Sequence, residues 1–252
     1  MAQTAPEAEI TEDLVLGGKV RVRQPRVGYR AGLDAALLAA ACDAKAGERV
    51  LEAGCGVGGA LLAAAVRRPD ARFVGVERDP AALDLARLNV ALNGLDARVE
   101  VLAADIAKGF RAPGLEPFDA AIANPPFFDD AASLRGPHPS RTDAYIATEG
   151  LAAWCAFLLK AVREGGSITI IHRADRLADL LAGLAPKAGS FRIRPIQPFA
   201  DERAKRVIVR AIKTGKAPLA LLPPLVLHER GGGKHTVEAE AILRGGAELR
   251  WA

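Results

Sequence analysis

Short apolar segments alternate with helical segments along most of this 252-residue chain, and this alternation constrains the fold more than any other feature. The apolar segments have the length of buried strands, and the segments between them carry the end signals of helices. We expect strands at 49–53, 72–77, 99–103, 118–123, 167–172, 191–195 and 206–213, and helices at 35–42, 58–68, 80–93, 150–163 and 174–184. Successive strands joined by helices pair in parallel through right-handed crossovers. The sequence therefore predicts an α/β fold with a seven-stranded, mostly parallel sheet and helices on both faces.

Both ends of the chain depart from this alternation. Residues 14–23 predict an N-terminal β-hairpin, because Gly17 and Gly18 can adopt the positive φ angles that a tight turn needs. The strands at 191–195 and 206–213 are joined without a helix, so we expect them to pair antiparallel at the sheet edge, with the last strand antiparallel. Beyond them we expect a short strand at 225–228 and a short helix at 236–243.

The expected domain organisation is one domain with a tail. Residues 1–10 are small, polar and acidic, which predicts a flexible tail. Residues 11–252 have the size of one large domain, in which 11–46 supply the hairpin and first helix and 47–252 the core. Half of all residues are hydrophobic, so such a chain can bury a large core without disulfides or metals.

The cysteine pattern indicates a reducing environment. Cys42, Cys55 and Cys155 are far apart and form no CxxC pair, so we expect three reduced thiols. The four histidines are scattered as well, and we expect no metal site. The chain shows neither a signal-peptide pattern nor an uninterrupted run of about 18 apolar residues. We therefore expect a cytoplasmic protein, a monomer or homodimer, that does not contact membranes.

Charge is distributed unevenly along the chain. Residues 187–252 hold 13 Lys and Arg against six Asp and Glu, a net charge of +7. Residues 1–186 hold 21 against 24, a net charge of −3. The last quarter can present a basic surface to phosphates, or it can be an ordinary solvated face. Charge alone leaves both interpretations open.

A glycine-rich turn follows the first strand of the alternation, in residues 51–59. Glycine lets the backbone turn sharply and approach a ligand closely, and the helix that follows offers free N–H donors. The spacing of Gly54, Gly56 and Gly59 satisfies the GxGxxG pattern of dinucleotide-binding proteins. Glu77, at the end of the next strand, can accept both hydroxyls of a ribose. At this point an NAD(P) enzyme and an enzyme using S-adenosylmethionine (SAM) are both compatible with the turn.

Two carboxylates favour SAM over a dinucleotide. Glu52 lies two residues before the first glycine, and an acid there suits the sulfonium and ammonium of SAM but repels a pyrophosphate. Asp105 and Ile106 follow the third strand, where Asp105 can accept a hydrogen bond from an adenine amino group. The same residue can instead be the N-cap of a helix.

The loop after the fourth strand, residues 124–128, predicts the chemistry. Carboxyl ends of parallel strands share one edge, so this loop faces the same cleft as the glycine turn. The side-chain oxygen of Asn124 and the carbonyl of Pro125 can each accept one N–H of a conjugated amino group, which exposes the nitrogen lone pair. Pro125 and Pro126 stiffen the backbone, and Phe127 can stack on a planar target. We expect methyl transfer to a planar, conjugated nitrogen, with Asn124, Pro125, Pro126 and Phe127 as catalytic residues.

These motifs resemble those of the class I SAM-dependent methyltransferases, which have a Rossmann-like fold. More closely, the chain is similar to the bacterial tRNA adenine-N6 methyltransferases that modify valine tRNA. The resemblance runs from about Leu14 to the C-terminus and includes the hairpin, the segment 24–34 and the loop 124–128. The family most often has Tyr at the position of Phe127, and the Asn-Pro-Pro-Phe loop also resembles that of guanine-N2 methyltransferases of ribosomal RNA.

The resemblance adds Asp34, which would lie beside the cofactor, and implies that Asn124 holds the adenine amine. Together with the residues of the two loops, it gives a set of expected cofactor-binding positions: Asp34, Glu52, Gly54, Cys55, Gly56, Glu77, Arg78, Asp105, Ile106 and Asn124. On the substrate side we expect contacts from Phe127, Phe128, Arg135, Arg141 and Arg203. The arginines lie in a loop at 133–143 and in the connection between the last two long strands, where they can meet phosphates or form ordinary surface loops.

The leading hypothesis is a SAM-dependent N-methyltransferase acting on adenine N6 in tRNA. Guanine N2 in ribosomal RNA and a glutamine side chain of a protein are the alternative targets. Glutamine methyltransferases carry a helical N-terminal domain, whereas only about 45 residues precede the first strand here. A non-catalytic RNA-binding protein of the same fold is a hypothesis of a different class. An NAD(P) oxidoreductase leaves Asn124-Pro125-Pro126 unexplained.

Overall fold

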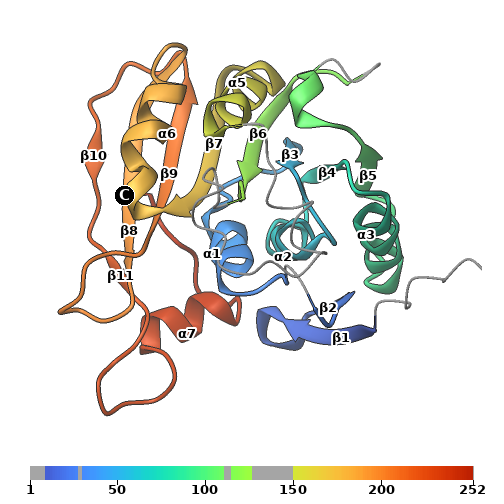
Figure 1. Ribbon diagram of the computed structural model, residues 1–252, viewed down its shortest axis with the longest axis horizontal. Coiled ribbons are helices and arrows are strands. Elements are labelled where there is room, and N and C mark those ends of the chain that lie inside the picture. The colour runs from blue at the N-terminus through green and yellow to red at the C-terminus, as the bar shows by residue number, and fades with distance from the viewer. Residues whose placement is uncertain (1–8, 28–29, 111–114, 127–149, 252) are drawn as a thin grey trace, which may run out of the picture.

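The computed structural model describes residues 9–27, 30–110, 115–126 and 150–251. One mixed sheet runs through it, and helices cover both of its faces (Figure 1). The seven long strands are β3 (Arg49–Ala53), β4 (Arg72–Glu77), β5 (Val99–Ala103), β6 (Phe118–Ala123), β7 (Val162–Arg173), β8 (Ala188–Gln197) and β9 (Arg206–Lys213). In space they follow the order β8-β9-β7-β6-β3-β4-β5. The neighbours from β7 to β5 are all parallel, as predicted.

β9 is antiparallel and pairs with β8, as predicted, and it lies between β8 and β7 in the sheet. The free edge of β8 pairs with two short parallel strands, β10 (Ala220–Leu221) and β11 (Leu225–Val226), which bring the sheet to nine strands. The sheet therefore has two more strands than the seven that we expected. A short strand at 225–228 was predicted and corresponds to β11, whereas β10 was not predicted. Both strands have two residues, too short to leave a periodic pattern.

Three helices cover one face of the sheet: α1 (Leu33–Ala41), α2 (Gly59–Arg67) and α3 (Pro80–Leu92). α5 (Leu151–Ala161) and α6 (Leu177–Leu184) cover the other face (Figure 1). The short helix α7 (Val237–Leu243) lies below α1, beside the hairpin. Each face of the sheet has its own hydrophobic cluster between strands and helices. The prediction of helices on both faces of the sheet is therefore confirmed.

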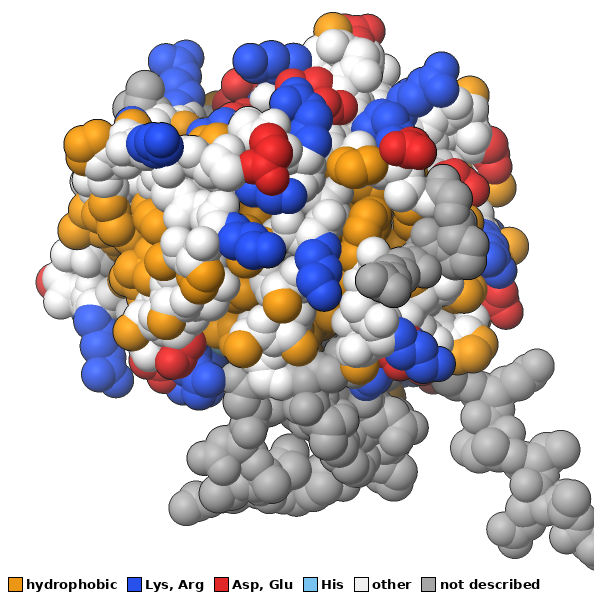
Figure 2. Space-filling view, turned by 90° about the horizontal axis from the view of Figure 1, so that it is seen from above, with side chains coloured by type: hydrophobic (Ala, Val, Ile, Leu, Met, Phe, Trp, Pro, Cys, Tyr) orange, Lys and Arg blue, Asp and Glu red, His pale blue; other side chains and the backbone are white. Residues whose placement is uncertain are grey.

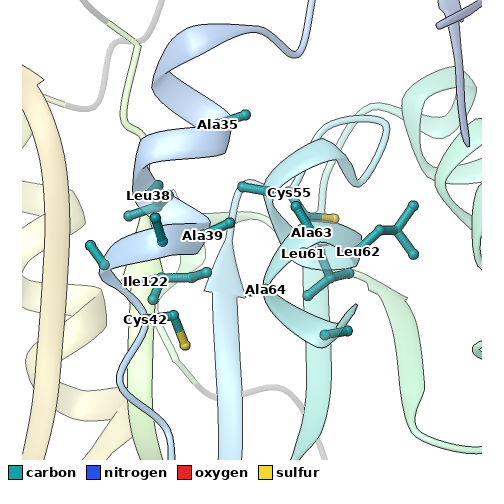
Figure 3. Packing of buried hydrophobic residues seen from close by; sticks show 14 of the residues in the cluster. Ala35, Leu38, Ala39, Cys42, Cys55, Leu61, Leu62, Ala63, Ala64 and Ile122 are labelled. Atoms are coloured by element: carbon teal, nitrogen blue, oxygen red, sulfur yellow. The ribbon is translucent and has the colours of Figure 1, made fainter. Parts of the chain in front are cut away.

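The packing of α1 against α2 depends on small side chains. Figure 3 shows Ala39 of α1 close to the alanines of α2, above the strands. A Cβ added to Gly59, the first residue of α2, would lie 2.2 Å from the Cβ of Ala31 in the segment just before α1, so this segment approaches α2 more closely than a larger residue allows. The thiols of Cys42, Cys55 and Cys155 are all free and buried, as expected.

The hairpin consists of β1 (Ile10–Val15) and β2 (Val20–Pro25), joined by a short 3₁₀ turn. Gly17 and Gly18 have φ angles of 66° and 87°, which confirms the predicted turn. Ile10 belongs to β1 instead of the expected tail, since the strand continues to the pair Ile10↔Pro25. Residues 1–8 lie outside the described part of the chain.

The helix predicted at 150–163 and the strand at 167–172 have a different boundary. α5 ends at Ala161, and β7 begins at Val162 and passes through Gly165 and Gly166. A Cβ at Gly166 would lie 2.6 Å from the Asp119 carbonyl oxygen on β6. Gly166 therefore allows β7 to approach β6, Gly165 has a positive φ of 76°, and neither residue ends the helix. Residues 174–176 form a 3₁₀ turn ahead of α6, and β8 is longer than the predicted strand at 191–195.

Candidate active site

The glycine turn between β3 and α2 has the conformation that only glycine adopts readily. Gly54, Gly56 and Gly58 have φ angles of 64°, 55° and 89°. A Cβ at Gly54 would lie 2.4 Å from Cη2 of Trp154 on α5, whereas a Cβ at Gly56 would meet no atom of the described residues within 4 Å. One side of the turn is therefore packed against α5, and the side at Gly56 is open to a ligand.

The Glu77 carboxylate, at the end of β4, is hydrogen-bonded to this turn. Its Oε2 accepts from the Gly56 N–H at 2.9 Å, and its Oε1 accepts from the backbone N–H groups of Arg78 and Asp79 at 2.8 and 2.9 Å. A carboxylate has about four acceptor positions, so capacity for a ribose hydroxyl remains. Arg78 is exposed at the same strand end. The structure thus brings the predicted ribose-binding acid next to the glycine turn.

Glu52 is a buried acid with an unused oxygen. Its side chain belongs to β3 and is only 3% exposed, and within the described residues Oε2 accepts no hydrogen bond. Burial and then the nearby Glu77 carboxylate raise the pKa of Glu52 well above its ordinary value. An unpaired buried carboxylate is unfavourable, so this acid suits a cationic ligand such as the ammonium of SAM.

A small hollow of about 40 Å³ joins the two predicted loops. Its walls come from the start of α1, the end of β3, the glycine turn and the end of β6: Ala31, Ala35, Glu52, Gly54, Cys55, Val57, Gly59, Ala60 and Asn124. The glycine turn and the Asn-Pro-Pro loop do meet at the carboxyl edge of the sheet, as the parallel topology predicts. Because the hollow holds little more than a water molecule, a cofactor would lie mainly along the open side of Gly56.

Cys55 can contact a ligand only through its backbone, because its side chain is buried. Its Sγ points into the core, where a Cβ on Gly75 of β4 would lie 2.7 Å from it. Burial raises the pKa of the Cys55 thiol well above its ordinary value, and the carboxylates of Glu52 and Glu77 raise it further. This thiol is therefore a packing group.

Asn124 begins the loop directly after β6, and its side-chain oxygen is buried at the hollow. Pro125 is buried and Pro126 is partly exposed. The remaining predicted residues of this region, Phe127, Phe128, Arg135 and Arg141, lie outside the described residues. The structure thus places the first half of the predicted catalytic loop beside Glu52 and the glycine turn.

Asp105 does cap a helical turn. Its Oδ1 accepts from the Ala107 N–H at 3.0 Å, at the start of the 3₁₀ turn Ile106–Lys108. This confirms the capping interpretation, and a contact between Asp105 and adenine stays a prediction. Ile106 is buried under the sheet end.

Asp34 and Arg203 lie toward the other end of the same edge. Asp34, in the first turn of α1, accepts from Nε of Arg206 at 3.2 Å. Arg206 is the first residue of β9, and the preceding connection carries the exposed Arg203. This ion pair ties the predicted cofactor-side acid to the predicted substrate-side connection.

Part of the positive charge of the last quarter is paired with acids. Within the described residues, ion pairs in this quarter and to earlier segments occupy six of its 13 cations: Lys205–Glu202, Arg206–Asp34, Arg210–Asp43, Lys213–Glu164, Arg230–Asp201 and Arg244–Glu240. On the face that carries α5 and α6, Lys and Arg side chains lie among apolar and acidic ones (Figure 2). Both interpretations of the remaining positive charge therefore stay predictions.

Sequence reasoning missed two residues that hold the glycine turn. Trp154 packs under Gly54, and Asn89 of α3 is fully buried and donates from Nδ2 to the Val57 carbonyl at 2.9 Å. Asn89 also exchanges two hydrogen bonds with the Arg23 backbone of β2, and Asn93 does the same with Arg21. Asparagine is unfavourable inside a helix, so Asn89 within α3 is a signal that could have been found in the sequence. No such signal marks Trp154.

The described residues contain no group of three or more His, Cys, Asp and Glu side chains that could hold a metal ion. None of the helices described is long and apolar enough to span a membrane.

Comparison with known proteins identifies the family. Residues 25–135 match the methyltransferase small domain family model. The tRNA1(Val) (adenine(37)-N6)-methyltransferase of Porphyromonas gingivalis is 31% identical over 195 residues, which cover 74% of this chain and 76% of that protein. The release factor glutamine methyltransferase of Mycolicibacterium smegmatis is 34% identical over 124 residues, covering 46% of this chain and 43% of that protein.

A solved structure supports the same assignment. A predicted O-methyltransferase from Agrobacterium tumefaciens superimposes with a TM-score of 0.71 at 29% identity, covering 86% of this chain and 98% of that one. The arrangement of the glycine turn, Glu77 and Glu52 fits SAM, the methyl donor that this class of enzymes uses. The chain therefore belongs to the SAM-dependent N-methyltransferases and, among them, to the tRNA1(Val) (adenine(37)-N6)-methyltransferase family.

Proposed function

We propose that the chain methylates the exocyclic N6 of an adenine in tRNA. The observation that carries this proposal is the shared hollow of Glu52, Gly54 and Asn124, which sets an acceptor for an amino group beside the turn that binds SAM. The P. gingivalis relative is named for this reaction at adenine 37 of a valine tRNA. A tRNA substrate also implies a cytoplasmic enzyme, and we include this location in the proposal.

Asn124 and Pro125 would orient the target. The Asn124 side-chain oxygen and the Pro125 carbonyl each accept one N–H of the adenine amine, which turns the nitrogen lone pair toward the methyl group. Bound SAM supplies an activated methyl group on its sulfonium. The adenine amine needs no general base before transfer, because its proton becomes acidic only afterwards. The contribution of these residues is positioning and electrostatic stabilisation of the transition state.

The cofactor would be held by groups from three strand ends. Glu77 accepts from the ribose, Glu52 attracts the ammonium, and the backbone of the glycine turn lies against the methionine part. Asp105 keeps one oxygen available for the adenine ring, because its N-cap bond uses Oδ1. We include Asp34, Arg78 and Ile106 in the same site, at its margins.

A glutamine side chain is the second candidate target. The M. smegmatis relative acts on a release factor and matches over 124 residues, and an amide NH₂ presents the same two N–H groups to Asn124. The match covers 43% of that protein, so it indicates a similar methyltransferase domain more than a similar substrate. The longer match to the tRNA enzymes favours adenine.

Labelled SAM with bulk tRNA is the decisive assay. After digestion to nucleosides, label in N6-methyladenosine supports the proposal, and label in N2-methylguanosine would redirect it to guanine. Label in a release factor, with none in RNA, would refute it in favour of the glutamine reaction. Bulk tRNA from cells that lack this methyltransferase is the substrate, since it is unmodified at the target.

A further inference from the structure

Three partly exposed aromatic side chains form a row near the carboxyl end of β8, which we call the ring row: Phe199, His228 and His235. The ring centroids of Phe199 and His228 are 5.5 Å apart, and those of His228 and His235 are 5.1 Å apart in a stacked geometry. The guanidinium of Arg230 lies 4.6 Å from the Phe199 centroid. No part of the expected cofactor or catalytic site uses this row.

The ring row is held in place by backbone hydrogen bonds. The N–H of His228 donates to the Pro198 carbonyl at 2.8 Å, and the N–H of Thr236 donates to the Leu227 carbonyl at 2.9 Å. Residues 228–235 therefore form a closed loop, with three consecutive glycines at 231–233, fixed beside the β8–β9 connection. A stacking surface fixed in this way loses little entropy when a ligand binds.

Two exposed cations in this region belong to no ion pair among the described residues, although the charge of Lys234 helps to lower the pKa of Glu240. Arg230 pairs with Asp201 and Glu202, which satisfies both acids of the connection. Arg203 and Lys234 are exposed and form no ion pair within the described residues. The connection and the closed loop thus combine aromatic rings with two available positive charges.

The ring row is on the same side of the molecule as Asn124. β8 is antiparallel to β9, and β9 is antiparallel to β7, so β8 points the same way as β6. Three strand spacings of about 4.8 Å separate β6 from β8, and the row therefore lies roughly 20 Å from Asn124 once the extra length of β8 is included. RNA bound at Asn124 can reach this distance through nucleotides flanking the target.

We propose that the ring row, Arg203 and Lys234 form a second RNA contact, which takes an unpaired nucleotide near the target base. The base stacks on the histidine rings and the neighbouring phosphates pair with the two cations, a combination common to proteins that bind single-stranded RNA. This contact rests on the proposed function, because the RNA that it binds is the substrate. It would select for a loop of the tRNA rather than for a helix.

Direct binding tests this proposal without using methyl transfer. The probe is fluorescently labelled, unmodified bulk tRNA, titrated at several salt concentrations. The double variant Arg203→Ala/Lys234→Ala should bind about tenfold more weakly at low salt and lower the salt slope of log K by about 1.5. His235→Ala should bind tRNA at least about fivefold more weakly, with an unchanged salt slope of log K. His235→Phe should bind as the wild type does, because a base can stack on any flat ring.

The matched control is Lys45→Ala/Lys160→Ala, which removes two exposed lysines at the opposite edge of the sheet and should bind as the wild type does. If Arg203→Ala/Lys234→Ala binds like this control, the second contact is refuted while the methylation assay stands. If the wild type methylates no tRNA but the ring-row variants still lose RNA affinity, the proposed function fails and the contact stands. A wild type that binds no RNA overturns both.

Discussion

Asn89 of α3 donates from its side-chain Nδ2 to the Val57 carbonyl of the glycine turn, at 2.9 Å. The same fully buried amide exchanges two hydrogen bonds with the Arg23 backbone on β2. One side chain thus links a helix, the hairpin and the glycine turn that we propose as the cofactor-binding turn. The hairpin thereby becomes part of the support of the active site.

Replacing Asn89 should therefore weaken both the fold and the cofactor site. In Asn89→Ala the Val57 carbonyl and the Arg23 N–H and carbonyl lose their partner in a buried place, which costs about 2–4 kcal/mol of unfolding free energy. Urea unfolding measures this loss, and titration calorimetry should show weaker SAM binding. Asn93→Ala is the matched control, because the Asn93 side chain forms the same two hydrogen bonds with the Arg21 backbone but none with the glycine turn among the described residues. Equal SAM affinity in the two variants would contradict the linkage.

Glu52 should make stability depend on pH. Its pKa is raised well above 4.5 in the folded protein by burial and then by Glu77. The stability it contributes is therefore fully present below pH 4.5 and is lost as the pH rises toward the folded pKa. Glu52→Gln has no carboxyl group to ionise, so its unfolding free energy should not fall in this way. The difference in unfolding free energy between Glu52→Gln and the wild type should therefore grow above pH 5, by at most about 1.4 kcal/mol per pH unit.

Urea unfolding at several pH values between 5 and 8 measures this trend. Glu100→Gln, an exposed position on β5, is the control and should follow the wild type at every pH. A constant difference between Glu52→Gln and the wild type would show that Glu52 ionises normally in the folded protein. SAM binding should also release a proton from Glu52, which calorimetry in buffers of different ionisation enthalpy detects.

Asn124 should act on the transition state more than on cofactor binding. Asn124→Ala removes one of the two acceptors for the target amine, and a lost acceptor of this kind lowers kcat by about 10²–10³-fold. SAM affinity should stay within a few-fold of the wild type, because the glycine turn and the two glutamates are untouched. Single-turnover methylation of tRNA and calorimetry separate the two effects. A large loss of SAM binding with kcat preserved would reverse the assignment.

The sequence predicted the strands of the sheet better than the contacts that support the site. β3, β4, β5, β6 and β9 have the predicted limits, because short apolar runs between polar or glycine residues leave little choice of boundary. The start of β7 was missed since Gly165-Gly166 has the local pattern of a helix end, whereas the reason for Gly166 is its close approach to the Val162 side chain and to the Asp119 carbonyl on β6. Asn89 and Trp154 were missed for the same reason, because their roles depend on residues that the fold brings near.

Gly54 and Gly56 should respond differently to the same substitution. Both have positive φ, so alanine at either position costs about 1–2 kcal/mol in backbone strain. At Gly54 the new methyl would also overlap Trp154 at 2.4 Å, and overpacking of a core adds a further 1–3 kcal/mol. Gly54→Ala should therefore be the less stable protein, with a visibly lower Tm.

Gly56→Ala should instead lose ligand affinity. No described residue lies within 4 Å of the added methyl, which projects from the side of the turn where the cofactor would lie. We expect Gly56→Ala to unfold within about 2 kcal/mol of the wild type but to bind SAM at least tenfold more weakly. Differential scanning fluorimetry and calorimetry on the two variants measure both quantities. If Gly56→Ala binds SAM normally, the cofactor does not use that side of the turn, since a methyl group there would collide with any ligand lying against the backbone.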